Sequence, residues 1–288
     1  MSEVKSKSSL FFQIVVGTFF VMISIVTIIP ILRVISISLS SKTAILSGQV
    51  WVLPVQFTAE AYHRAFGNSN FTHSFIYSIL ITLAYTGICM IMTILAAYPL
   101  SKPGLKGRKL IMTLFVLTMY FDPGTIPNYL NVKSFGFIDT IWALIIPGAL
   151  SAYNLIIMRS FFSGIDKSLY ESAYMDGCTE NKALLKIALP LAIPAVATLS
   201  LFYAVSRWNG ISDVLYYINT TSLYTVQMML KQMIDSVKIS MQEGTSSQLV
   251  ADNIKAASIV ISMTPMLIAY PFIQRYFTKG IMLGAVKG

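Results

Sequence analysis

The chain has 288 residues, of which 55% are hydrophobic and only 11% are charged, and its mean hydropathy is +0.69. This composition excludes an ordinary soluble domain and indicates a protein that lies largely inside a membrane. The net charge of +9 does not indicate a nucleic-acid partner, because the basic excess is spread over short segments between apolar runs.

Six apolar segments are predicted to cross the membrane as helices. A crossing helix needs about 20 apolar residues, and charged or turn-forming residues bound these segments. The predicted spans are residues 8–32, 75–100, 110–120, 140–158, 187–206 and 256–274. The first is not interpreted as a cleaved signal peptide, because its apolar core is too long and no cleavage site of small residues follows it. The expected fold class is therefore an all-α integral membrane protein with six transmembrane helices.

The third predicted span is interrupted by Asp122, Pro123 and Gly124, with Pro127 close behind. A break near a membrane face is typical of non-helical backbone that lines a water-filled cavity. Two long segments connect spans on the outer side, and each is predicted to contain one short helix. These segments are residues 33–72, with a helix at 57–66, and residues 208–255, with a helix at 225–237.

The distribution of charge predicts the orientation in the membrane. The N-terminus, residues 101–109, residues 159–186 and the C-terminus together carry 13 of the 21 basic residues but only five of the 12 acidic residues. Loops rich in Lys and Arg face the cytoplasm. Both chain termini and residues 159–186 are therefore predicted to be cytoplasmic.

A polar stretch with a helical pattern, Glu171 to Pro190, lies between two predicted spans. Ser168 and Glu171 have the spacing of a capping box and predict the start of a first helix. Gly177 is predicted to end that helix, because glycine readily adopts the left-handed conformation that a helix end requires. Thr179 is predicted to begin a second helix.

This stretch resembles the EAA loop of bacterial ABC-importer permeases, where Glu-Ala-Ala, a glycine and Ile-x-Leu-Pro recur at the same intervals. Ser172, in place of the second alanine, is the one departure. The resemblance implies that Glu171 contacts a basic residue in the cleft of an ATPase and that Gly177 provides the bend that seats the helix. The ATPase-coupling residues that it implies are Glu171, Ser172, Ala173, Asp176, Gly177, Ile187, Leu189 and Pro190.

Residues 113–217 are similar to carbohydrate-type permeases of this family, which resemble the second permease of the maltose system. The matching motifs are GTIPNY at 124–129, FGFIDT at 135–140, IP at 146–147, RSFF at 159–162, WN at 208–209, and KG and GAVKG at 279–288. The run from Asn154 to Arg159 resembles the branch that takes up products of complex-polysaccharide breakdown. Asp122 and Pro123 depart from the small polar residues expected there.

The resemblance implies the permease subunit of a type I ABC importer for a sugar or oligosaccharide in a bacterial cell membrane. The implied partners are a second permease, two ATPase subunits, an extracellular or periplasmic solute-binding protein and membrane lipid. ATP and magnesium would bind to the ATPase subunits, and this chain would hold no cofactor. The expected organisation is a single transmembrane domain over residues 1–288, with a core at 75–278, a coupling loop at 163–190 and an external segment at 208–255.

Aromatic and polar residues near the third, fourth and fifth spans are candidates for the substrate pathway, because sugars bind aromatic faces together with amides and charges. They are Tyr120, Asp122, Asn128, Tyr129, Tyr153, Asn154, Tyr203, Arg207, Trp208 and Asn209. Arg207 would suit an acidic oligosaccharide, but an arginine reaching to the interface fits equally well. Each aromatic also fits a role in helix packing. In the family, the partner permease is expected to hold most sugar contacts.

Enzymatic interpretations have less support. The chain has no phosphate-binding loop of the G-x-x-x-x-G-K-[ST] type, and His63 and His73 lack the spacing of metal ligands. Cys89 and Cys178 predict neither a disulfide framework nor a metal site. Two alternatives stay open: a permease for another solute, such as an amino acid or modified peptide, and an integral-membrane enzyme such as a glycosyltransferase with residues 208–255 as its active-site segment.

Overall fold

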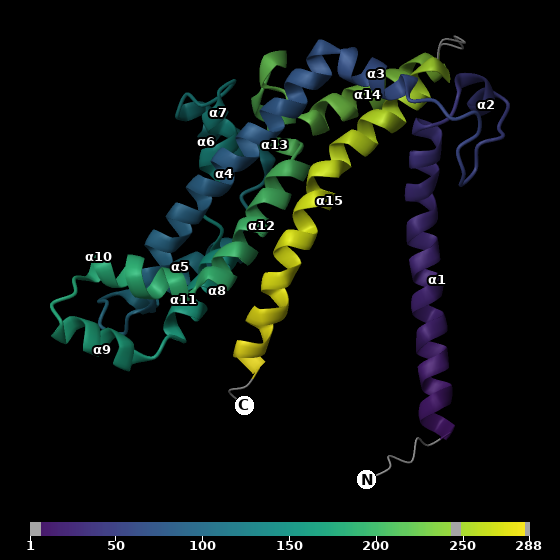
Figure 1. Ribbon diagram of the computed structural model, residues 1–288. Coiled ribbons are helices and arrows are strands. Elements are labelled where there is room, and N and C mark those ends of the chain that lie inside the picture. Colours follow the sequence, from purple (N-terminus) through teal and green to yellow (C-terminus); the bar gives the residue numbers. More distant parts are fainter. Residues whose placement is uncertain (1–6, 243–248, 286–288) are drawn as a thin grey trace. The chain divides into compact units, whose positions relative to one another are not determined.

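A computed structural model describes residues 7–242 and 249–285, whose regular structure is helical apart from an isolated bridge between Ser40 and Phe57 (Figure 1). Residues 1–6 and 286–288, which carry part of the predicted terminal charge and of the closing motif, lie outside the described residues. The chain divides into two compact units. One comprises Met1–Thr72 and Leu230–Met263, and the other comprises His73–Met229 and Thr264–Gly288.

The first unit begins with α1 (Lys7–Ser38), which is apolar around its whole circumference. This helix contains the first predicted span and continues past it to Ser38. Its described side chains are almost all exposed as far as Leu32, as expected for a helix covered by lipid or by another chain. The predicted helix at 57–66 is α3 (Glu60–Gly67), where the Tyr62 hydroxyl lies 2.8 Å from the Ser38 hydroxyl.

Three further helices lie wholly or partly in this unit. The predicted helix at 225–237 is confirmed and is longer than expected. The helices are α2 (Lys42–Leu46), α14 (Val226–Gln242) and α15 (Leu249–Ala285), which contains the sixth predicted span.

The second unit is built around α4 (Ser69–Ser101), which contains the second predicted span. Every fourth residue from Ile81 to Ala97 is buried, so one narrow face of the helix packs against its neighbours. Cys89, Thr93 and Ala97 are small and fully buried, which allows close approach of other helices. The other elements are α5 (Arg108–Tyr120), α6 (Thr125–Ser134), α7 (Ile141–Ile145), η1 (Ile146–Gly148), α8 (Ala152–Ser163), α9 (Lys167–Met175), α10 (Glu180–Ala183), η2 (Leu184–Ala188), α11 (Leu189–Leu191), α12 (Ile193–Asn209), α13 (Ser212–Tyr217) and η3 (Thr221–Leu223).

Three helical segments among the described residues are long and apolar enough to cross a membrane, and two bent helix pairs raise that number to five. The long segments are Phe12–Ser38, Ser69–Ser101 and Asp252–Pro271. The fourth predicted span is a pair, Ile141–Gly148 and Ala152–Ser163, bent by 52°. The third predicted span forms α5, which has 13 residues and is shorter than the ~20 that a crossing needs. Six crossings therefore stay a prediction.

The predicted break after the third span is confirmed at residues 121–124, between α5 and α6. The Asp122 carboxylate accepts a hydrogen bond of 3.0 Å from the Gly124 amide and stabilises this turn. The sequence suggested that Pro127 is part of the break, but it is not. It lies in the first turn of α6, where its missing N–H leaves no helical hydrogen bond unmade.

Asp139, from the FGFIDT motif, joins the turn before α7 to the segment that follows α13. Its carboxylate accepts hydrogen bonds from the Thr220 hydroxyl at 2.6 Å and from the amides of Thr220 and Asn219 at 2.8 and 2.9 Å. These bonds, the Thr220 hydroxyl first, hold the pKa of Asp139 below its usual value.

The break between η1 and α8 is stabilised by two buried tyrosines. The Tyr203 hydroxyl accepts a 3.1 Å hydrogen bond from the Ser151 amide and lies 2.8 Å from the Thr93 hydroxyl. Tyr85 donates a 3.1 Å hydrogen bond to the Gly148 carbonyl. Backbone groups freed by a break inside a membrane have no water to bind, so side chains must satisfy them.

We predict that Gly148→Ala lowers stability, because a Cβ atom at this residue would lie 2.5 Å from the Tyr85 hydroxyl oxygen. Overpacking at a buried site costs about 1–3 kcal/mol. Thermal unfolding of the purified protein in detergent should show the lower midpoint. Gly87→Ala is the matched control, because a Cβ atom there meets nothing within 4 Å. Equal midpoints for the two variants would contradict the prediction.

Candidate functional site

Residues 164–192, here called the connector, link α8 to α12 and begin with α9. The helix starts two residues earlier than the sequence predicted. Asp166 is its N-cap, and its carboxylate accepts a 3.0 Å hydrogen bond from the Ser168 amide. Ser168 is thus inside the helix, and the predicted capping box with Glu171 is wrong. A carboxylate just ahead of the helix satisfies a free amide and also favours the positive end of the helix dipole.

The predicted end of this first helix is confirmed. Asp176 follows its last residue, and Gly177 has φ of +78°. The Cys178 amide reaches back to the Ala173 carbonyl at 2.9 Å, a bond that closes the helix end. A Cβ atom at Gly177 would meet nothing within 4 Å, so conformation, and not space, requires glycine here.

The second limb of the connector is helical from Glu180 to Leu191 and bends by 80° before α12. Thr179 precedes it as predicted, although no capping bond from its hydroxyl is seen among the described residues. The turn at Leu184–Ala188 is a wide π-helical turn, in which the Leu189 amide donates to the Leu184 carbonyl. Pro190 has no amide to donate, which favours such an irregular turn.

This geometry corrects the start of the fifth predicted span. Ile187, Leu189 and Pro190 lie on the connector side of the bend, and the straight helix begins at Ile193. Prolines at 190 and 194 interrupt the backbone hydrogen bonds that a continuous helix would need.

Both limbs of the connector are tied to the end of α4 by Lys102. Its ammonium lies 3.5 Å from the ring centroid of Tyr170 and 4.7 Å from that of Tyr98, and it lies 3.8 Å from the Glu180 carboxylate. Glu180 also accepts hydrogen bonds from the hydroxyls of Tyr98, at 2.9 Å, and Tyr174, at 2.8 Å. We call these five residues the Lys102 cluster. A cation between aromatic faces and a carboxylate is favourable in a partly buried site.

The electrostatics of the cluster follow from partial burial. Burial lowers the pKa of Lys102 from its usual value, and the charge of Glu180 opposes that effect. Burial, with the hydrogen bond to Glu180, raises the pKa of Tyr174 to about 12. The phenol therefore stays protonated at neutral pH and donates to the carboxylate.

The two faces of α9 differ. Tyr170 is 8% exposed on the face toward Lys102, whereas Leu169 is 47% and Met175 88% exposed on the outer face. Ser172 is exposed as well, and Glu171 is exposed at the edge of a cavity of about 510 Å³ that Lys102 and Tyr170 also line. Figure 1 shows α9 and α10 at the same end of this unit as the end of α4. The inner face of α9 is occupied by its own chain, and the outer face is open.

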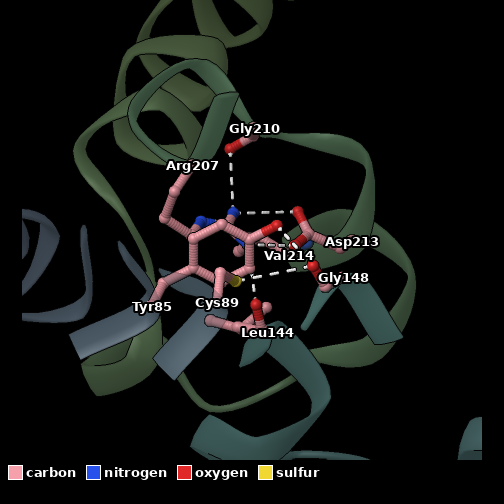
Figure 2. Close-up of polar contacts among 8 residues, drawn as sticks. All are labelled: Tyr85, Cys89, Leu144, Gly148, Arg207, Gly210, Asp213 and Val214. Carbon is pink, nitrogen blue, oxygen red and sulfur yellow. Dashed lines mark hydrogen bonds and ion pairs between the residues drawn. The ribbon is translucent and has the colours of Figure 1, made fainter. Parts of the chain in front are cut away.

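A second cluster lies at the C-terminal end of α12, around the buried Arg207 in its last turn (Figure 2). The guanidinium forms a bidentate ion pair with Asp213, and it donates to the Leu144 carbonyl at 3.1 Å. It lies 5.8 Å from the ring centroid of Tyr85. Gly210 leaves room for it, because a Cβ atom there would lie 2.8 Å from the Arg207 Nη2 atom. The arginine thus holds α12, α7 and α13 together.

The ten substrate-pathway candidates separate into two groups. Tyr203, Arg207, Trp208 and Asn154 are buried, and the first three pack or bond within their own chain. The other six are half-buried or exposed, and one of them, Asn209, borders a cavity of about 450 Å³ together with Arg207. The rest of this group is Tyr120, Asp122, Asn128, Tyr129 and Tyr153, of which Tyr129 stacks on Tyr217.

The sequence analysis missed the Lys102 cluster and the carboxylate partner of Arg207. One signal was present: Tyr170 and Tyr174 are four residues apart and must share one face of a helix. Nothing in the sequence pairs that face with Lys102, which is about 70 residues earlier in the chain.

We predict that Lys102→Met loosens the connector, because the tyrosine rings and Glu180 lose the cation that they surround. Hydrogen bonds to a charged group contribute about 1.5–3 kcal/mol, so amide hydrogen exchange in α9 and α10 should become about tenfold faster or more. Lys106→Met, an exposed lysine in the same loop, is the control. Lys102→Arg should restore slow exchange. Unchanged protection in Lys102→Met would contradict the role assigned to the cluster.

We also predict that Asp213→Asn destabilises the protein, because it leaves a buried guanidinium without its counter-charge. Breaking a buried pair costs about 3–5 kcal/mol, and the partial exposure of Asp213 reduces this to about 2–3 kcal/mol. Asp235→Asn, which removes the carboxylate from the exposed pair with Lys231, should cost less than about 1 kcal/mol. The measurement is the thermal unfolding midpoint of each variant. Similar decreases for Asp213→Asn and Asp235→Asn would contradict the prediction.

The chain is similar to known transport proteins. The sequence profile of the family described as binding-protein-dependent transport system inner membrane component matches residues 90–283. The polygalacturonan/rhamnogalacturonan transport system permease protein YtcP of Bacillus subtilis (strain 168) is 39% identical over 286 residues, which cover 98% of this chain and 100% of YtcP. Protein LplC of the same strain is 40% identical over 266 residues, which cover 91% of this chain and 90% of LplC.

A solved structure is also similar. It is the crystal structure of a bacterial ABC transporter involved in the import of the acidic polysaccharide alginate, and one of its chains is 32% identical to this one. The match covers 96% of this chain and 100% of that chain, with a TM-score of 0.88.

Proposed function

Because this chain belongs to the family of binding-protein-dependent transport system inner membrane components, we propose that it is the permease subunit of an ATP-driven importer for an oligosaccharide. The family is a transport family, which favours this function over the integral-membrane enzyme. Its name implies an external solute-binding protein that delivers the cargo. The proposed assembly adds a second permease and two ATPase subunits, and ATP and magnesium bind to the ATPases.

The proposed cargo is an acidic oligosaccharide released from an acidic polysaccharide. Support comes from two relatives whose names concern polygalacturonan with rhamnogalacturonan and alginate. Both relatives are at least 30% identical to this chain over nearly its whole length. The same relatives weigh against an amino acid or a modified peptide as cargo.

The proposed topology has six crossings, with both chain termini in the cytoplasm. The three long helices and the two bent pairs supply five crossings. The sixth is the span predicted at 110–120, formed by α5 together with the turn at 121–124 and α6. In this topology the connector faces the cytoplasm, and the transmembrane domain comprises residues 1–288, with its core at 75–278 and the external segment at 208–255. The basic residues of the loops on the connector side support this orientation.

The observation that carries the coupling role is the division of α9 into a tied inner face and an open outer face. The outer face, with Ser172, would enter the cleft of an ATPase, together with the exposed Glu171 at the edge between the two faces. Closure of the ATPase pair would then move the connector as one body, because Lys102 joins both limbs to α4. The second limb passes directly through the 80° bend into α12, so the same motion reaches the core.

The exposed members of the substrate-pathway set remain our candidates for sugar contact. Tyr120 and Tyr153 are 79% and 55% exposed, and aromatic faces of this kind suit the C–H surface of a sugar ring. Arg207 is a weaker candidate, because Asp213 already neutralises its charge. Its role is to hold the outer ends of α7, α12 and α13 around the cavity.

The decisive experiment begins with a tagged chain purified from its native host in mild detergent. We expect a second permease and an ATPase to co-purify, and we expect ATP hydrolysis to rise when a binding protein loaded with a galacturonate oligosaccharide is added. Glu171→Lys and Gly177→Asp should abolish uptake while the protein remains in the membrane, because the first reverses a charge at the proposed contact and the second strains the turn.

Gly67→Asp is the control for the glycine variant, because Gly67 is exposed at the end of α3, has no positive φ and has open space around it. It should retain uptake. Wild-type uptake in Glu171→Lys and Gly177→Asp, or a chain that purifies alone without an ATPase, would overturn the proposed coupling.

A further inference from the structure

A cavity of about 750 Å³ lies beside the first turn of α5 and is separate from the surface of the connector that faces outward. The loop between α4 and α5 borders it on one side, and Arg159 of α8 borders it on the other. The charged side chains that line it are Arg108, Lys109 and Arg159, and no acidic side chain lines it. The cavity therefore concentrates positive charge at one end of the helices.

These three cations have no carboxylate partner in the described parts of the chain, 7–242 and 249–285. Arg159 is held in place by a 3.0 Å hydrogen bond from its Nε atom to the Leu100 carbonyl, which neutralises no charge. Arg108 also borders the neighbouring cavity, where Glu171 and Glu180 lie, but it forms an ion pair with neither. Like charges gathered without a counter-ion favour the binding of an anion.

The start of α5 adds to the positive electrostatic potential of the cavity. Its N-cap is Gly107, which has φ of +77° and no side chain to accept from the first amides of the helix. The Arg108 amide bonds the Leu105 carbonyl at 3.4 Å, and the positive end of the helix dipole lies at the cavity, because Gly107, Arg108 and Lys109 all line it. This arrangement suits a phosphate group.

The helix surface that continues from the cations is apolar and open. No residue of α5 is buried in this chain. Beyond Thr113, which lines the cavity, Val116 and Leu117 follow on the same side of the helix and are 36% and 44% exposed. A ligand that fills the site would thus meet positive charge at the turn and hydrocarbon along the helix.

We propose that the cavity bordered by Arg108, Lys109 and Arg159 binds the phosphate headgroup of an anionic glycerophospholipid, whose acyl chains lie along α5. Basic pockets at helix ends on the cytoplasmic side are suited to anionic headgroups. The inference rests on the proposed orientation, which places this turn at the cytoplasmic membrane surface. It does not rest on the identity of the cargo or on ATP coupling.

The test is lipid binding to the purified complex, measured by native mass spectrometry in detergent that contains equal amounts of phosphatidylglycerol and phosphatidylcholine. We expect phosphatidylglycerol to be retained in preference. One basic residue contributes about fivefold in affinity for an anionic surface. Lys109→Gln should therefore weaken retention about fivefold, and Arg108→Gln with Lys109→Gln more strongly.

The matched control is Lys106→Gln, the same charge change at an exposed lysine of the same turn that does not line the cavity. It should leave retention unchanged. Arg159→Lys keeps the charge and removes the Nε bond, so it should retain the lipid if charge is the determinant. Equal losses in Lys106→Gln and Lys109→Gln would mean general attraction and would overturn the site.

Two further outcomes would also overturn it. If inorganic phosphate binds with the same sensitivity to these variants while phosphatidylglycerol is not retained, the site takes a free anion. If lipid retention is unchanged but the ATPase dissociates in Lys109→Gln, the cations serve an acidic protein surface. Because the measurement is made without ATP or cargo, a failed transport assay leaves its result intact.

Discussion

The geometry of the connector depends on the contacts that the Lys102 ammonium makes with aromatic rings and a carboxylate. Lys102 is the first residue after α4, so a short distance separates the rigid end of that helix from the charge. The rings of Tyr98 and Tyr170 and the carboxylate of Glu180 surround it, and these groups come from α4, from α9 and from α10. One cation can interact with several aromatic rings and a carboxylate at the same time, and these interactions depend on the positions of the groups. One side chain therefore sets the position of both limbs of the connector.

The cluster around Arg207 holds the C-terminal end of α12 in a similar way. A buried guanidinium is costly unless its charge and its N–H groups are compensated. Here Asp213 compensates the charge and, with the Leu144 carbonyl, the Nη groups, whereas the buried Nε has no hydrogen-bond partner among the described residues. The helix from Ile193 to Asn209 thus connects two polar clusters, one through the bend at its start and one through its last turn. A rigid element fixed at both ends can transmit a displacement along its length.

Breaks in the helices are a second recurring feature. The pair Ile141–Gly148 and Ala152–Ser163 bends where Tyr203 and Tyr85 bond the freed backbone groups at Ser151 and Gly148. The connector bends at Ala192, between two prolines. These interruptions explain why only three of the described helical segments are long enough to cross a membrane by themselves.

By itself the sequence determined the helical class, the apolar segments, the break at 121–124 and the turn at Gly177, because these depend on local composition and on the conformations that Gly and Pro allow. It also contained the spacing that resembles a coupling loop. Only the tertiary structure decided that Asp166 caps α9, that the fifth span bends at Ala192, and that Lys102 and Asp213 complete the two clusters. Contacts between residues far apart in the chain depend on how helices pack, and periodicity within one helix carries no information about which partner its face will meet.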